Sequence, residues 1–111
     1  MINHILLTKH SINRGYDRLS ANSDELSINA NQAYTNGNRK SDFKGKFRKY
    51  LDTKSKEYPL NTLRIHNGII WVFSNDLGMT HNSLPIKYLI TFYPVPKRYK
   101  WLDTYKNIKY D

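Results

Sequence analysis

The stretch Leu63-Arg64-Ile65-His66-Asn67-Gly68-Ile69-Ile70-Trp71-Val72-Phe73 contains the clearest structural signal in the chain. An Asn-Gly pair between two apolar runs favours a type I′ turn, in which both central residues have positive φ. The two-residue turn fixes the pairing of a β-hairpin, so that Ile65 lies opposite Ile70. Strand side chains alternate between faces, which predicts one wholly apolar core face. That face holds Leu63, Ile65, Ile70 and Val72.

The opposite face of this hairpin mixes cations with aromatic rings, and two arrangements are open for it. In the first, Trp71 stacks on unpaired bases while Arg64 and His66 contact phosphates. In the second, a helix from residues 42–56 covers the face and packs Trp71 against the stem of Arg64. Arg64, His66 and Trp71 are therefore candidate nucleic-acid contacts.

Outward from the hairpin, residues 1–60 have helical character. Thr8 or Ser11 can cap a first helix, and an apolar stripe recurs along it at Ile12, Tyr16 and Leu19. A second helix is predicted from Ser23 to the Asn36-Gly37 stop, and a third over residues 42–56. The polar segment 74–85 is predicted to be an exposed loop, and residues 86–93 a further strand.

This order of elements predicts an α+β fold in which N-terminal helices pack on a small antiparallel sheet of three to four strands. We assign residues 1–96 to one domain and residues 97–111 to a basic, aromatic C-terminal tail, which can also dock as a final helix or strand. Lys97, Arg98 and Lys100 in this tail alternate with aromatic residues, so they are candidate nucleic-acid contacts as well.

The composition of the chain limits the classes of molecule that it is expected to bind. The 111 residues carry 18 Lys plus Arg against nine Asp plus Glu, a net charge of +9, which suits a polyanion such as nucleic acid. No cysteine is present, which fits the cytoplasm. The absence of a long apolar run or a signal peptide predicts no membrane partner. The four histidines lack metal-ligand spacing and no nucleotide-binding glycine loop occurs, so neither metal nor cofactor is expected.

The first predicted helix places three cationic groups on one side. His10, Arg14 and Arg18 follow at four-residue steps, within a stripe of about 80°. The stripe is either an ordinary solvated face or a phosphate-binding ridge. In the second case His10 can move the proton for attack by a ribose 2′-hydroxyl, and the guanidiniums can hold the phosphate. Thr91 supplies a hydroxyl on the last strand, either for packing or for this chemistry.

The order of these motifs resembles a known group of proteins. Thr8, His10, Arg14 and Arg18 come first; Ala33 to Gly37, an aromatic and basic helix, the hairpin and Leu89-Ile90-Thr91 follow. The order is similar to that of small proteins from Gram-positive phages and prophages. Through them it resembles the BECR superfamily of metal-independent RNases, named for barnase, EndoU, colicin-type tRNases and RelE toxins. The resemblance covers residues 8–96.

The resemblance implies RNA cleavage through a 2′,3′-cyclic phosphate in a bacterial host cell. It implies that His10 is the general acid or base, that Arg14 and Arg18 bind phosphate, and that Thr91 forms a hydrogen bond at the sheet. It also implies RNA as a partner, together with a host or antitoxin protein.

Two functions from different classes stay open at this stage. The first is a phage- or mobile-element-encoded protein, RNA-binding or RNase-like, of the toxin type. The alternative is a non-catalytic phage protein that binds and inhibits a host defence or nucleic-acid-processing complex. Cleavage of RNA without a metal separates the first, in its catalytic form, from the second.

Overall fold

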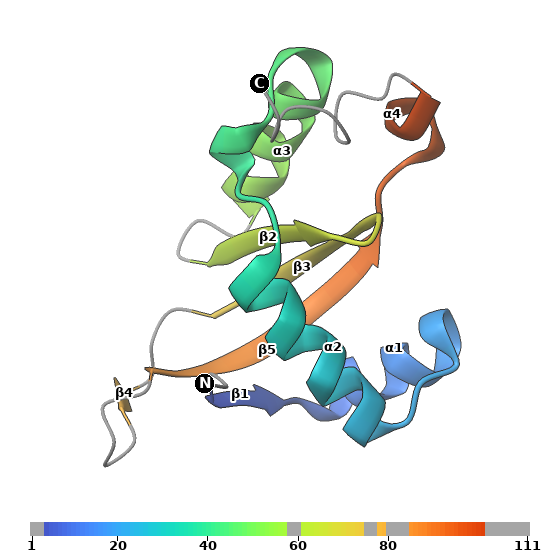
Figure 1. Cartoon of the computed structure of the whole chain (residues 1–111), viewed down its shortest axis with the longest axis vertical. Coiled ribbons are helices and arrows are strands. Elements are labelled where there is room, and N and C mark those ends of the chain that lie inside the picture. The colour runs from blue at the N-terminus through green and yellow to red at the C-terminus, as the bar shows by residue number, and fades with distance from the viewer. Residues whose placement is uncertain (1–3, 58–60, 75–77, 80–84, 102–111) are drawn as a thin grey trace.

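The computed structural model describes residues 4–57, 61–74, 78–79 and 85–101 (Figure 1). In chain order the elements are β1 (His4–Leu7), α1 (Lys9–Leu19), α2 (Ser23–Asn36), the 3-10 helix η1 (Lys40–Asp42), α3 (Gly45–Glu57), β2 (Thr62–His66), β3 (Ile69–Phe73), β4 (Gly78–Met79), β5 (Pro85–Pro94) and α4 (Lys97–Trp101). The α+β fold class is confirmed. No helix in the described ranges has the length and apolar composition needed to cross a bilayer.

The sheet is mixed rather than purely antiparallel. Its strand order is β1-β5-β3-β2, and β4 pairs with the beginning of β5. β5 pairs antiparallel with β3 but parallel with β1. Residues 4–7 form a strand where the sequence predicts helical character, because a four-residue apolar run without turn signals does not distinguish a strand from a helix.

The predicted hairpin is confirmed in turn and register. Asn67 and Gly68 have φ values of 53° and 74°, the positive values of a type I′ turn. Ile65 pairs with Ile70, and Leu63 pairs with Val72. All four residues of the predicted core face are buried.

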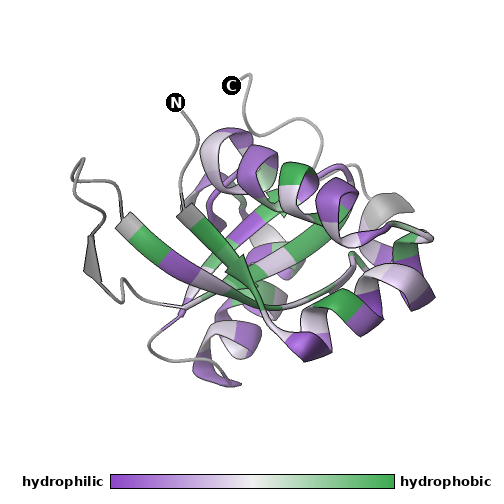
Figure 2. Cartoon of the chain, turned by 90° about the horizontal axis from the view of Figure 1, so that it is seen from below, coloured by the Kyte–Doolittle hydropathy of each residue, from purple (hydrophilic) through white to green (hydrophobic). Residues whose placement is uncertain are grey.

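Hydrophobic cores lie on both faces of the sheet, between layers of helix. Figure 2 shows hydrophobic strands flanked by largely hydrophilic helices. The α3-side core comprises Phe43, Phe47, Leu51, Leu63, Ile65, Ile70, Val72, Val95 and Tyr99. The α2-side core comprises Ile5, Leu26, Ala30, Ala33, Trp71, Phe73, Leu89 and Phe92. The mixed hairpin face is therefore covered by α2, which neither of the two predicted arrangements included.

α1 packs through small residues and only part of the predicted apolar stripe, since Leu19 packs against the α2-side core. Ser11 and Gly15 are its buried residues, whereas Tyr16 has an exposed fraction of 58%. A Cβ at Gly15 would lie 3.0 Å from Cδ2 of Leu26, so the missing side chain lets α1 approach α2 closely. The prediction that Tyr16 belongs to the buried face of α1 is wrong. The face that packs closely against the rest of the protein is centred on Ser11 and Gly15.

Gly37, which ends α2, is expected to be intolerant of even a methyl group. A Cβ there would lie 2.3 Å from the Ala33 carbonyl oxygen and 3.1 Å from Cβ of Arg64. Because backbone groups must move to relieve this overlap, Gly37→Ala should lower the free energy of unfolding by about 1–3 kcal/mol. Urea denaturation measures the change. Gly45→Ala is the control at an open site, since nothing lies within 4 Å of a Cβ there; its cost should come only from its positive φ.

Candidate nucleic-acid interface

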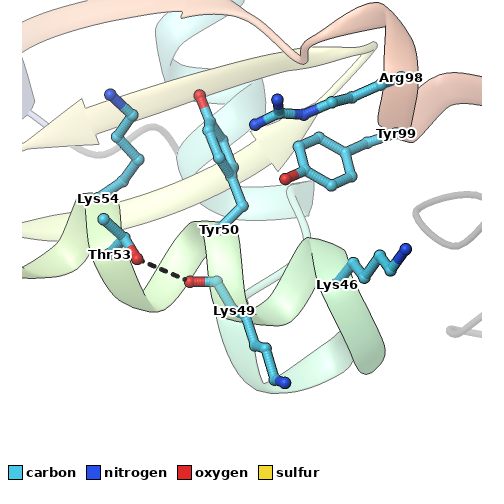
Figure 3. A pocket seen from close by; sticks show the side chains of 7 residues that line it. All are labelled: Lys46, Lys49, Tyr50, Thr53, Lys54, Arg98 and Tyr99. Atoms are coloured by element: carbon cyan, nitrogen blue, oxygen red, sulfur yellow. Dashed lines mark hydrogen bonds between the residues drawn. The ribbon is translucent and has the colours of Figure 1, made fainter.

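A basic groove runs between α3 and α4, with a volume of about 510 Å³. α3 contributes five side chains and α4 contributes two, as Figure 3 shows. The residues that line the groove are Lys46, Lys49, Tyr50, Thr53, Lys54, Arg98 and Tyr99. Four of these seven are cations and none is a carboxylate, so the groove suits an anion.

α4 holds Arg98 over the groove because its neighbour Tyr99 is anchored in the α3-side core. Tyr99 is 8% exposed, and its ring centroid lies 5.3 Å from that of Phe47 and 5.0 Å from that of Tyr50. The Arg98 guanidinium carbon lies 4.8 Å from the Tyr99 ring centroid and 5.9 Å from that of Tyr50. In Figure 3 Arg98 reaches across toward Tyr50, so the two helices share one binding surface.

Most of the positive charge in the groove is uncompensated. Lys54 is 3.4 Å from the Glu57 carboxylate, and its ammonium also lies 5.7 Å from the ring centroids of Tyr50 and Tyr93. Among the described residues, Lys46, Lys49 and Arg98 have no carboxylate partner. These three cations are therefore available to an external anion.

Tyr50 stands in the floor of the groove as a neutral hydrogen-bond donor. Burial raises the pKa of its phenol, against the opposing effects of Lys54 and Arg98. The phenol thus stays protonated at neutral pH. Its half-buried ring offers a flat surface beside the cations, the combination that binds unpaired bases with their backbone.

The predicted nucleic-acid contacts do not form one site. Arg98 lines the groove and Lys97 is exposed on the same helix, α4. Lys100 belongs to α4, but its side chain lies outside what the structure describes. Arg64 faces the other way, with its guanidinium carbon 5.0 Å from the Tyr34 ring centroid on α2. His66 is half-buried at the end of β2, apart from the groove residues.

The prediction that Trp71 is a stacking platform for bases is wrong. Trp71 is 2% exposed under α2, and its ring stacks on Phe92 with centroids 5.1 Å apart. Its indole Nε1 donates to the His66 carbonyl oxygen at 3.4 Å. Phe73 on the same face is fully buried. These rings belong to the core because α2 covers the face that the sequence left open.

Arg18 and Thr91, two of the four catalytic candidates, lie on opposite sides of the sheet. The Arg18 guanidinium donates to the Phe92 carbonyl oxygen, and Arg18 lines a small apolar pocket with Phe92 and Ile69 on the α2 side. Thr91 pairs with Val72, whose side chain belongs to the α3-side core. Paired residues of neighbouring strands share a face, so the Thr91 side chain points toward α3. A register shift in β5, between the residues that pair with Val72 and Phe73, determines to which face of the sheet Thr91 belongs.

The other two candidates are exposed or half-exposed on α1. His10 is exposed near the start of the helix and Arg14 is half-buried. The eight-residue separation of His10 from Arg18 corresponds to about 12 Å along the helix axis. The structure therefore does not bring His10, Arg14, Arg18 and Thr91 to one point.

The lysines of α3 line the groove but are not among the nucleic-acid contacts that the sequence predicts. Lys46, Lys49, Tyr50, Thr53 and Lys54 recur at the spacing of one helical face. This pattern is visible in the sequence beside the apolar stripe of the same helix, and it is the signal that identifies these residues. What the sequence does not reveal is that α4 closes the groove from the other side.

The described residues hold no group of three or more His, Asp or Glu side chains arranged for a metal ion. The candidate interface is thus defined by cations and tyrosines. No protein-family model matches this chain, and neither a curated protein nor a solved structure matches it.

Proposed function

We propose that this protein binds single-stranded nucleic acid, RNA in the first place, in the groove between α3 and α4. The observation that carries the proposal is the lining of that groove, with four cations, two tyrosines and no carboxylate. RNA is favoured over DNA by the resemblance of the sequence to the BECR superfamily.

Two features support a single strand over a duplex. The half-buried Tyr50 ring stands in the floor of the groove, and only unpaired bases can present their faces to such a ring. The cations flank this ring, as the phosphates flank the bases in a single strand. Cleavage is not part of the proposal, because Arg18 and Thr91 lie on different sides of the sheet.

Binding should depend on salt through the groove lysines. Each phosphate that a cation neutralises contributes about −0.7 to the slope of log affinity against log salt for single strands. Contacts from the three cations without a carboxylate partner predict a slope of about −2 for the native protein, and Lys49→Ala should reduce its magnitude by about 0.7. Fluorescence anisotropy with a labelled 15-nucleotide RNA, titrated at several salt concentrations, measures both slopes.

Lys9→Ala is the matched control, because Lys9 is also an exposed lysine but lies on α1. It should leave the slope unchanged. If both variants reduced the magnitude of the salt slope equally, binding would depend only on net charge, and the groove would not be the binding site. The RNA recovered after incubation without a metal is expected intact, and cyclic-phosphate ends on fragments would restore the RNase hypothesis.

A further inference from the structure

A second basic cavity, of about 290 Å³, lies on the other flank of α3. Its Ser55 is about 140° around the helix from Tyr50, so the cavity is separate from the groove. Besides Leu63, six polar residues line it: Arg39, Lys40, Ser41, Ser55, Asn61 and Arg64. All six carry hydrogen-bond donors, and no carboxylate is among them.

The backbone places the two arginines of this cavity in neighbouring positions. After α2 ends, Asn38 pairs with Ile65 on β2 through two hydrogen bonds of 2.8 Å. Arg39 directly follows Asn38, and Arg64 directly precedes Ile65, so the pairing brings both arginines to the cavity. One Arg64 nitrogen donates to the Leu63 carbonyl oxygen at 3.0 Å, which orients its guanidinium. Burial, and then the charge of Arg39, lower the pKa of Arg64, so the two like charges oppose each other there.

The local charges leave a surplus of about two positive units. Asp52 is 3.3 Å from Lys40 and 3.2 Å from Arg48, and Asp42 accepts a hydrogen bond of 2.9 Å from the Arg39 backbone nitrogen. Two carboxylates thus stand against four cations, the fourth being Arg64. A dianion would balance this surplus.

We infer that this cavity binds a phosphate monoester. A monoester carries a charge approaching −2 at neutral pH and has three strong acceptor oxygens, whereas a backbone diester carries −1 and has two free oxygens. Two guanidiniums can hold such a group bidentately, and the serine hydroxyls and the asparagine amide can satisfy the remaining oxygen. The same chemistry occurs at a phosphorylated RNA end and in a free mononucleotide, and both sources fit the cavity. The inference does not depend on RNA binding in the groove.

The test uses one 10-nucleotide RNA with a hydroxyl, a 5′-phosphate or a 3′-phosphate end, and adenosine 5′-monophosphate as the free ligand. Competition experiments followed by fluorescence anisotropy measure the affinities of the RNAs, and isothermal titration calorimetry measures the affinity of the mononucleotide. We expect the native protein to bind a phosphorylated RNA at least 10-fold more tightly, to bind the mononucleotide, or to do both. Arg39 is exposed, so Arg39→Ala should keep the fold and abolish these preferences.

Arg98→Ala separates the cavity from the groove. This substitution should lower the affinity for all three RNAs equally. It should leave the preference for a terminal phosphate and the affinity for the mononucleotide unchanged. Mononucleotide binding that Arg39→Ala removes, with no RNA binding at all, would support the cavity and reject the groove. Equal affinity for all RNA ends together with no mononucleotide binding would overturn the inference, as would preferences that persist in Arg39→Ala.

Discussion

Trp71→Ala is expected to lower the free energy of unfolding by about 3–5 kcal/mol, the usual cost of truncating a buried tryptophan. Trp71 on β3 is buried under α2, stacks on Phe92 of β5 and donates a hydrogen bond through its indole. Alanine leaves a cavity between elements that are already paired, and the surrounding core cannot collapse to fill it. Urea denaturation followed by circular dichroism measures the loss.

Trp71→Phe is the control, because it keeps a ring on Phe92 and should lose much less stability. RNA affinity of this variant should equal that of the native protein, since the groove lies on the other face of the sheet. A Trp71→Phe protein that unfolds at the native urea concentration but binds RNA far more weakly would mean that Trp71 contacts bases after all.

The double substitution Lys46→Glu with Lys49→Glu is expected to weaken RNA binding roughly 100-fold at physiological salt. It changes the charge of the groove by four units, and each phosphate contact is worth about a factor of three to four under these conditions. Both side chains are exposed on α3, so the fold should be unaffected. Anisotropy titration at 0.15 M salt, about the physiological value, measures the effect.

The matched control reverses two cations of α1, Lys9→Glu with Arg14→Glu, and changes the net charge equally. It should weaken binding far less, through long-range attraction only. If this control loses as much affinity as the α3 variant, the interface does not lie in the groove. If it loses more, the ridge predicted on α1 is the interface.

Local signals in the sequence predicted local structure well. The Asn67-Gly68 turn determined the hairpin register, because a two-residue loop permits only one pairing. Asn22 and Glu25 form a capping box that begins α2 where the sequence predicted. These features depend on interactions between residues close together in the chain, so they can be predicted without knowledge of the tertiary structure.

Long-range features were not predictable in the same way. The burial of Trp71 depends on α2, which covers that face of the sheet. The face of the sheet to which Thr91 belongs depends on a register shift in β5. The groove also requires α4, whose residues the sequence predicts only as part of a C-terminal tail. Each of these outcomes comes from contacts between distant segments, which periodicity along one segment does not record.

The position of β5 at the centre of the sheet has a consequence for the order of folding. During synthesis β1, α1, α2 and the β2–β3 hairpin all emerge before β5, yet β1 has no partner until then, because Leu7 pairs with Leu89. Local helices and the hairpin can form within microseconds, but joining the N-terminal strand requires closing a loop of about 80 residues. Arrival of β5 therefore completes both halves of the sheet in one step, and until that step β1 presents open strand edges to other nascent chains.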